Sequence, residues 1–143
     1  EFDLVKLRTM VVGAEREGTG WAVDHGDPRI TRVGRVLRRL SLDELPQLWN
    51  VVRGEMSLVG PRPTLAYQVE RYTPRQRRRL EVLPGITGWA QVNGWRGETD
   101  TEEKIKKRVE HDLFYIENWS FSFDMVIILR TLWALWNTRR NAY

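Results

Sequence analysis

Proline and glycine divide the central part of this chain into short segments. Proline cannot continue a helix from its interior and cannot donate to a sheet ladder, so each proline marks a start, a bend or an end of an element. The six prolines stand at positions 28, 46, 61, 63, 74 and 84 of a chain of 143 residues. Short helices joined by tight turns are therefore expected in this part, with longer helices only after it.

Two helices are predicted in the first half of the chain. The dipeptide Asp27-Pro28 is a favourable helix start, and apolar residues recur after it at helical spacing. Ser41 and Glu44 have the spacing of a capping box for a second helix, which Gly54 ends.

Two strands are predicted from alternation and β-branched residues. Residues 2–12 form the first, and residues 86–92 form the second, between turns at 84–85 and 93–94. Residues 57–63 read as a loop stiffened by two prolines. The two strands could form a β-hairpin or a small sheet.

Further helices are predicted at 65–72, at 73–80 and from about residue 101 onward. The last helix, at about 121–136, is apolar but too short and too interrupted to span a bilayer, which takes about twenty apolar residues. We expect it to pack in the core, with a membrane surface as the alternative. The aromatic residues Trp119, Phe121 and Phe123 are expected to pack in the core, or to face a membrane or a membrane helix outside this chain.

Composition favours one globular domain over residues 1–143, of the α+β class and mainly helical. The chain has 41% hydrophobic and 29% charged residues. It lacks cysteine, which excludes disulfides, zinc-thiolate sites and a cysteine nucleophile. With only His25 and His111, any metal would be a hard cation held by oxygen ligands.

The positive charge is local. Residues 28–80 hold twelve arginines and four acids, a balance of +8, whereas the remainder holds eleven basic and fifteen acidic residues, a balance of −4. Arginine suits bidentate phosphate contacts and stays charged when partly buried. A solvated helix face is the plain alternative for any single arginine, and in particular for the cluster at 75–79.

Asp43 and Glu44 are adjacent acids between this arginine-rich segment and the rigid Pro-Arg-Pro turn at 61–63. Carboxylates among guanidinium groups suit a metal-assisted reaction at a phosphate, because one acid can attack or hold a metal while arginines take up phosphate charge. Helix capping is the structural alternative, and both roles can coexist.

Several motifs, in order, resemble the bacterial sugar transferases, the monotopic polyprenyl-phosphate phosphoglycosyl transferases. These motifs are Lys-Leu-Arg-Thr-Met at 6–10, Asp-Pro-Arg-Ile-Thr-Arg-Val-Gly-Arg at 27–35, Ser-Leu-Asp-Glu-Leu-Pro-Gln at 41–47, Gly-Glu-Met-Ser-Leu-Val-Gly-Pro-Arg-Pro at 54–63, Pro-Gly-Ile-Thr-Gly-Trp-Ala-Gln-Val-Asn-Gly at 84–94 and Asp-Leu-Phe-Tyr-Ile at 112–116. The variant Asn-Gly-Trp-Arg-Gly-Glu-Thr-Asp at 93–100 is most similar to the larger, colanic-acid type members that start exopolysaccharide repeat units.

The resemblance implies that a UDP-sugar gives its sugar-1-phosphate to undecaprenyl phosphate, with release of UMP. Glucose is the favoured sugar and galactose the second choice. The resemblance also implies a place on the cytoplasmic face of the bacterial inner membrane, in exopolysaccharide or O-antigen assembly.

Roles follow from the resemblance residue by residue. Asp43 would be the nucleophile that forms a phosphosugar-aspartyl intermediate, and Glu44 would help to bind Mg²⁺ or orient the site. The residues expected around the phosphates are Arg38, Arg62, Pro63, Arg96, Lys6 and Arg8. For Lys6 and Arg8 a place as solvent-facing strand residues is an equal alternative.

Members of the family carry a hydrophobic helix that enters the membrane just before the position where this chain begins. The first residue is not methionine, and the first residues read as the middle of a strand. We therefore expect this chain to be the catalytic domain of a longer membrane protein, without its N-terminal membrane helix.

Two other function classes have some support in the composition. Arginine clusters, seven tryptophans and a pI near 9.8 would suit a nucleic-acid groove, but a carboxylate pair among the arginines would repel a phosphate backbone unless a metal intervened. A catalytically silent membrane-surface module is the third reading. We expect the transferase, with no nucleic-acid partner.

Overall fold

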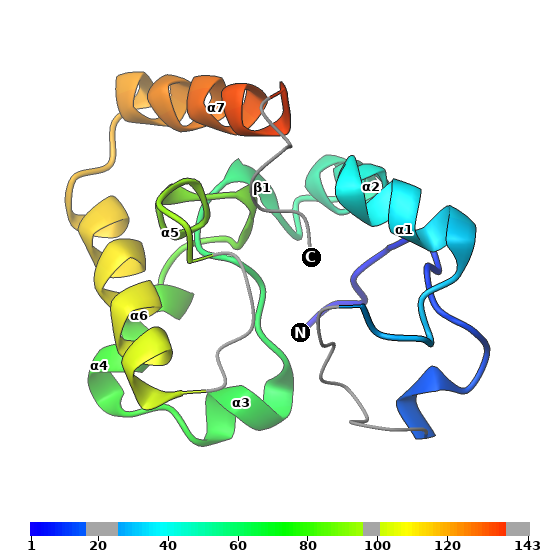
Figure 1. Ribbon diagram of the computed structural model, residues 1–143. Coiled ribbons are helices and arrows are strands. Elements are labelled where there is room, and N and C mark those ends of the chain that lie inside the picture. Colours follow the sequence, from blue (N-terminus) through cyan, green and yellow to red (C-terminus); the bar gives the residue numbers. More distant parts are fainter. Residues whose placement is uncertain (17–25, 96–100, 137–143) are drawn as a thin grey trace.

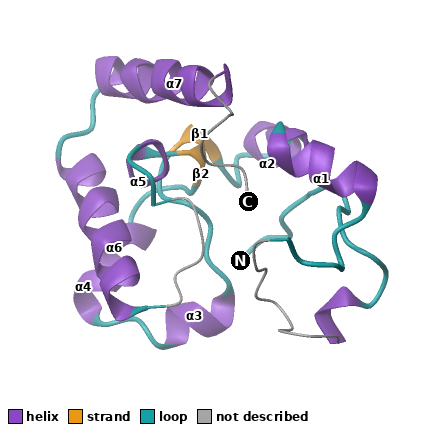
Figure 2. Cartoon of the chain, viewed as in Figure 1, coloured by secondary structure: helices purple, strands orange, loops and turns teal. Residues whose placement is uncertain are grey.

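The structure is a computed structural model that describes residues 1–16, 26–95 and 101–136 (Figures 1 and 2). Helices dominate it, which confirms the mainly helical α+β class. Within the described ranges, no helix has both the length and the apolar character needed to cross a membrane. In chain order, with η for short 3-10 helices, the elements are η1 (Ala14–Arg16), α1 (Arg32–Arg39), η2 (Leu42–Glu44), α2 (Gln47–Val52), β1 (Ser57–Val59), α3 (Ala66–Glu70), α4 (Pro74–Arg77), η3 (Arg78–Leu80), β2 (Gly85–Thr87), α5 (Trp89–Val92), α6 (Glu102–Glu117) and α7 (Phe121–Trp136).

The sheet is a parallel pair. Ser57 of β1 lies opposite Gly85 of β2, and Val59 lies opposite Thr87. The chain between the two strands passes through α3, α4 and η3, as a parallel connection requires. The expected small sheet is confirmed, but a hairpin is wrong. The loop predicted at 57–63 begins with a strand, because its backbone pairs with a segment that is remote in the sequence.

The second predicted strand, at 86–92, is wrong beyond Thr87. A Cβ atom at Gly88 would lie 2.2 Å from the carbonyl oxygen of Gly60, so only glycine lets the chain pass this close to the end of β1. The chain then turns into α5 at Trp89. The predicted turn at Asn93 and Gly94 consequently follows a helix instead of joining strands.

The predicted strand at 2–12 is also wrong. Its backbone bonds go to different kinds of partners: the Val5 amide donates to Asn50 Oδ1 at 3.1 Å, and the Leu7 amide donates to the Asp43 carbonyl at 3.0 Å. One isolated antiparallel bridge joins Met10 to Ile30. Alternation predicted an extended segment, but its neighbours are helix ends and side chains instead of another strand.

The first two helices begin later than predicted. The side chain of Thr31 accepts a bond from the Gly34 amide and caps α1, whereas Asp27 binds Arg29. The capping box predicted at Ser41 and Glu44 is wrong: Ser41 is left-handed with φ 55°, and its side chain forms no capping bond. The acids instead lie in η2, and α2 starts only after Pro46.

The later helices agree with the sequence. Thr73 forms a capping box with Gln76 at the start of α4. Thr101 accepts from the Lys104 amide and caps α6. Each cap is local chemistry within four residues, and for that reason it could be predicted from sequence alone.

The core lies between the sheet, α6 and α7 (Figure 1). Val59, Tyr115 and Ile127 are buried together, and partly buried apolar residues pack against them: Trp89, Val92, Ile116, Phe123 and Ile128. The expected core packing of α7 therefore holds for one face only. Exposed large apolar residues of α7 are Phe121, Met125, Val126, Leu129, Leu132, Trp133 and Trp136. Trp119 is exposed as well.

Candidate active site

The two predicted acids lie side by side in η2 and are both buried, with 3% of Asp43 and 6% of Glu44 exposed. One ammonium group serves both: Lys6 Nζ is 3.2 Å from Asp43 Oδ2 and 3.7 Å from Glu44 Oε1. A buried carboxylate is costly unless it is paired. Lys6 therefore lies beside both acids and stabilises their charge.

The N-terminal segment carries Lys6 to the acids. The backbone amide of Leu7, next in sequence, binds the carbonyl of Asp43 at 3.0 Å. Asn50 of α2 is completely buried; its Oδ1 accepts from the Val5 amide, and its Nδ2 donates to the Asp3 carbonyl at 2.8 Å. These bonds fix the backbone on both sides of Lys6.

Arg62 of the Pro-Arg-Pro turn contacts the carboxylate pair through Glu44. Its Nη2 donates to Glu44 Oε1 at 2.8 Å. The turn is anchored to the sheet, because the Gly85 amide donates to the Pro61 carbonyl at 2.9 Å. Pro61 is buried and Pro63 is half-buried, so the turn that presents Arg62 has little freedom.

Arg38, at the end of α1, is held beside the same N-terminal segment. Its Nε donates to Thr9 Oγ1 at 2.8 Å. The segment comes very close to α1 here, since a Cβ atom at Gly34 would lie 2.0 Å from the Thr9 carbonyl oxygen. Arg8 is exposed and forms no ion pair with a described residue. Arg96 lies outside the described residues.

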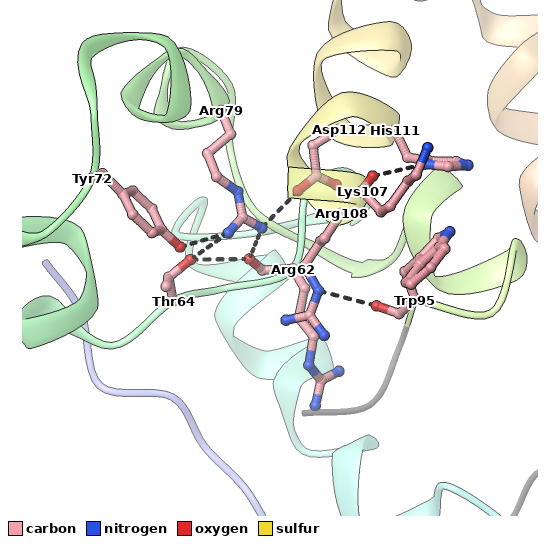
Figure 3. A network of polar contacts seen from close by, with 9 residues as sticks. All are labelled: Arg62, Thr64, Tyr72, Arg79, Trp95, Lys107, Arg108, His111 and Asp112. Atoms are coloured by element: carbon pink, nitrogen blue, oxygen red, sulfur yellow. Dashed lines mark hydrogen bonds and ion pairs between the residues drawn. The ribbon is translucent and has the colours of Figure 1, made fainter. Parts of the chain in front are cut away.

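A buried ion pair that the sequence analysis missed lies behind the Pro-Arg-Pro turn. Arg79 Nη2 is 2.8 Å from Asp112 Oδ2, and their side chains are 3% and 2% exposed. Arg79 also donates to the Arg62 carbonyl at 3.0 Å, to Thr64 Oγ1 at 3.1 Å and to the Tyr72 hydroxyl at 2.8 Å (Figure 3). A solvated face, expected for the cluster at 75–79, is thus wrong for Arg79. Its spacing in an arginine run gave no signal of burial.

Arg108 of α6 adds another guanidinium group that was not predicted. Its Nε donates to the Trp95 carbonyl at 3.0 Å, just before the segment that contains Arg96. Burial lowers the pKa of Arg108, and the nearby positive charges of Arg79 and Arg62 lower it further. The guanidinium groups of Arg62, Arg79 and Arg108 therefore lie in one region (Figure 3) and give it a positive potential.

Burial also shifts the pKa of Asp112. Desolvation raises its pKa to about 6, against the opposing effect of Arg79, Arg108 and His111. Elsewhere, Asp27 shows the reverse: bonds from Arg29 lower its pKa to about 2. Arg29 also donates to the Ala14 carbonyl at 2.7 Å and is buried, so this arginine of the motif has a structural contact.

The carboxylate pair has the donor atoms that Mg²⁺ prefers. Magnesium is usually bound through one or two carboxylates together with substrate phosphates, and η2 supplies two adjacent ones. The Lys6 ammonium between them indicates that this position accommodates a cation. Within the described residues, no group of three or more His, Cys, Asp or Glu side chains could hold a metal by itself. The residues present thus fit a metal shared with a phosphate ligand.

Comparison with known proteins identifies the family. Residues 1–138 match the family described as bacterial sugar transferase. The chain belongs to this family. The resemblance drawn from the motifs is thereby confirmed, and the acids, Lys6 and the Pro-Arg-Pro turn all lie within the matched range.

Named relatives within the family act on different sugars. Over 132 residues, covering 89% of this chain and 28% of the relative, the chain is 53% identical to the UDP-glucose:undecaprenyl-phosphate glucose-1-phosphate transferase of Escherichia coli (strain K12). It is 47% identical to the protein of the same description from Caulobacter vibrioides, with coverage of 99% of this chain and 54% of the relative. It is 42% identical to the UDP-galactose-lipid carrier transferase of Erwinia amylovora, with coverage of 92% and 30%. The chain thus spans between 28% and 54% of the length of these relatives.

Proposed function

We propose that this sugar transferase family member transfers a sugar-1-phosphate from a UDP-sugar to undecaprenyl phosphate and releases UMP. The observation that carries the proposal is the buried pair Asp43 and Glu44, held by Lys6 and by Arg62. Two carboxylates that share fixed cations suit covalent catalysis at a phosphate that is itself anionic. The names of the relatives supply the donor and the acceptor.

In the first step, an Asp43 carboxylate oxygen attacks the phosphorus that bears the sugar. A bond forms between that oxygen and phosphorus, and the bond from phosphorus to the bridging oxygen of UMP breaks. UMP leaves with the electron pair, and a phosphosugar-aspartyl intermediate remains. Asp43 suits this role better than Glu44, because Glu44 is bound by both Lys6 and Arg62.

In the second step, a phosphate oxygen of undecaprenyl phosphate attacks the same phosphorus. The bond from phosphorus to Asp43 breaks, the carboxylate is restored, and the polyprenyl diphosphosugar leaves. No proton is gained or lost in the two steps together, so the site needs charge stabilisation more than a general base.

The cationic residues provide that stabilisation. Arg62 would take up charge on the transferred phosphate, while Lys6 orients both acids. Asp43 and Glu44 would hold Mg²⁺, which supplies further neutralisation of phosphate charge when bound. Arg38 and Arg96 are proposed to contact the phosphates, and Pro63 to keep the turn rigid. Arg8, which is exposed, is proposed only as a contact to the acceptor headgroup.

Glucose is the proposed sugar, with galactose second. The relatives named for UDP-glucose are 53% and 47% identical, against 45% for one named for UDP-N-acetylgalactosamine and 42% for one named for UDP-galactose, so identity favours glucose and does not rank the other sugars. The proposed place is the cytoplasmic face of the bacterial inner membrane, where the reaction would start exopolysaccharide or O-antigen assembly.

The test is UMP release by the full-length protein from UDP-glucose and UDP-galactose, with Mg²⁺ and undecaprenyl phosphate in detergent. Asp43→Asn and EDTA are expected to abolish release. Asp3→Asn, the same change at an exposed acid, is the matched control and is expected to leave it unchanged. If no UDP-sugar yields UMP, the silent membrane-surface module becomes the better account.

A further inference from the structure

The buried pair of Arg79 and Asp112 contacts the backbone of the Pro-Arg-Pro turn, whereas the Arg62 side chain of this turn contacts Glu44. Asp112 belongs to α6 and Arg79 to η3, so the pair joins two elements through residues that are 33 positions apart in the sequence. Breaking a buried ion pair by removing one partner is far more disruptive than losing a surface pair. The position of Arg79 is therefore strongly determined by Asp112.

Two of the hydrogen bonds that Arg79 donates go to the Pro-Arg-Pro turn and the residue after it. One nitrogen binds the backbone carbonyl of Arg62 at 3.0 Å, and the other binds the Thr64 hydroxyl at 3.1 Å. Two contacts on either side of Pro63 hold the turn in one place. The Tyr72 hydroxyl, 2.8 Å away, holds Arg79 from a third side.

A continuous set of contacts thus leads from α6 to the acids. Asp112 binds Arg79, Arg79 binds the backbone of Arg62, and the Arg62 side chain binds Glu44. Arg62 is thus held at both ends: its backbone carbonyl binds Arg79, and its guanidinium group binds Glu44. Displacement of the first contact would move the last.

We propose that Asp112 and Arg79 are positioning residues that set the place of Arg62, and through it Glu44, for the transfer step. This inference rests on the proposed function. Neither residue touches the substrate in this account. Their effect on the reaction passes through Arg62 alone, which distinguishes positioning from a general contribution to folding.

A double-mutant cycle separates the two roles. The proteins are the full-length wild type, Asp112→Asn, Arg62→Ala and the double variant, with kcat/KM measured by UMP release from UDP-glucose. Misplacement of a reacting geometry by about 1 Å costs on the order of 100-fold. Asp112→Asn is therefore expected to lower kcat/KM about 10-fold to 100-fold when Arg62 is present. In the Arg62→Ala background the same change is expected to have almost no further effect.

Glu110→Gln is the matched control. It removes a carboxylate from the same helix, and among the described residues this carboxylate forms an ion pair with Lys107 alone, near the surface. Thermal unfolding of each variant shows which proteins are folded. Arg79→Lys replaces Asp112→Asn in the cycle if the latter does not fold, because lysine keeps the charge beside Asp112 but lacks the fork that reaches Arg62 and Thr64 together.

Equal losses in the two backgrounds, or no loss in a folded Asp112→Asn protein, would overturn the proposal. Amide hydrogen exchange at Gly60, Arg62 and Thr64, the residues of this segment that have a backbone N–H, tests it separately from activity. Exchange there is expected to be faster in Asp112→Asn than in Glu110→Gln, and unchanged exchange would contradict the inference. A wild type without activity on any UDP-sugar would instead count against the proposed function, while the exchange result would still decide the positioning role.

Discussion

Arg62 Nη2 lies 2.8 Å from Glu44 Oε1 and joins the Pro-Arg-Pro turn to the buried carboxylate pair. This contact brings together two motifs that are eighteen residues apart in the sequence. It places a guanidinium group at the acids from one side, while Lys6 approaches them with its ammonium.

Replacement of Arg62 is expected to affect catalysis more than folding. Arg62→Met should lower kcat/KM for UDP-glucose by about 100-fold or more, the usual loss when one group that stabilises developing charge is removed. Arg71→Met, at an exposed position after α3, should change it less than twofold, as is usual for an isolated surface charge. Steady-state UMP release measures both. Similar losses in the two variants would show that net charge, and not the contact to Glu44, is what matters.

Lys6 contributes to stability as well as to the site. Lys6→Met should lower the free energy of unfolding by about 1 to 3 kcal/mol, because two buried carboxylates lose the cation between them. The side chain of Lys6 is 36% exposed, so solvent screens part of this effect. Urea unfolding measures the change. Lys106→Met, at an exposed position of α6, is the control and should be nearly neutral.

The close approach at Gly85 predicts a steric effect. A Cβ atom there would lie 2.1 Å from the Gly60 amide nitrogen, where only backbone could yield. Gly85→Ala should therefore destabilise the protein by about 3 kcal/mol and displace the Pro-Arg-Pro turn. Gly94→Ala is the comparison. A Cβ atom at Gly94 would meet no atom within 4 Å, but the φ of +91° is unfavourable for alanine, so a loss of about 1 kcal/mol in the free energy of unfolding is expected. Equal costs by urea unfolding would contradict the close contact.

The two shifted carboxyls predict opposite responses to pH. Asp112 has a folded pKa of about 6, raised from 3.8, so the folded state binds its proton more tightly and stability falls as pH rises from about 4 to about 6. Asp27 has a pKa lowered to about 2, so its contribution is present above about pH 4 and is lost as pH falls toward 2.

The Asp112 effect is measured as a difference between proteins. The free energy of unfolding, measured with urea, is compared between the wild type and Asp112→Asn. The wild-type value minus the variant value should decline by roughly 3 kcal/mol between pH 4 and pH 6.5, since asparagine cannot titrate. Arg79, Arg108 and His111 face Asp112 and oppose the shift. A flat or rising difference would mean that these positive charges outweigh burial.

Local chemistry could be read from the sequence, and distant pairing could not. The caps at Thr73 and Thr101, the length of α7 and the acidic pair depend on a few neighbouring residues. The parallel pairing of β1 and β2 depends on residues about 28 positions apart in the register Ser57 to Gly85, and no local pattern marks it. The segment at 2–12 is extended as its alternation suggested, but its partners include the side chain of Asn50 and the backbone of Asp43.

That the residues of the candidate site lie together was predictable where a motif contained them. Asp43, Glu44, Lys6 and Arg62 meet in the structure. Arg79 was missed because its burial depends on Asp112, which is distant in sequence. The sequence did contain a signal for the other side of this ion pair. Arg108 and Asp112 have i, i+4 spacing on α6, and residues at that spacing share a helix face, so the sequence indicated that Asp112 lies beside a guanidinium group.

The most direct test of the central claim is mass spectrometry of the full-length protein after reaction with UDP-glucose and Mg²⁺ in the absence of acceptor. The account predicts a mass gain of one glucose phosphate on the peptide that contains Asp43, removed on addition of undecaprenyl phosphate and absent in Asp43→Asn. UMP release without any modification of that peptide, or continued release by Asp43→Asn, would contradict it.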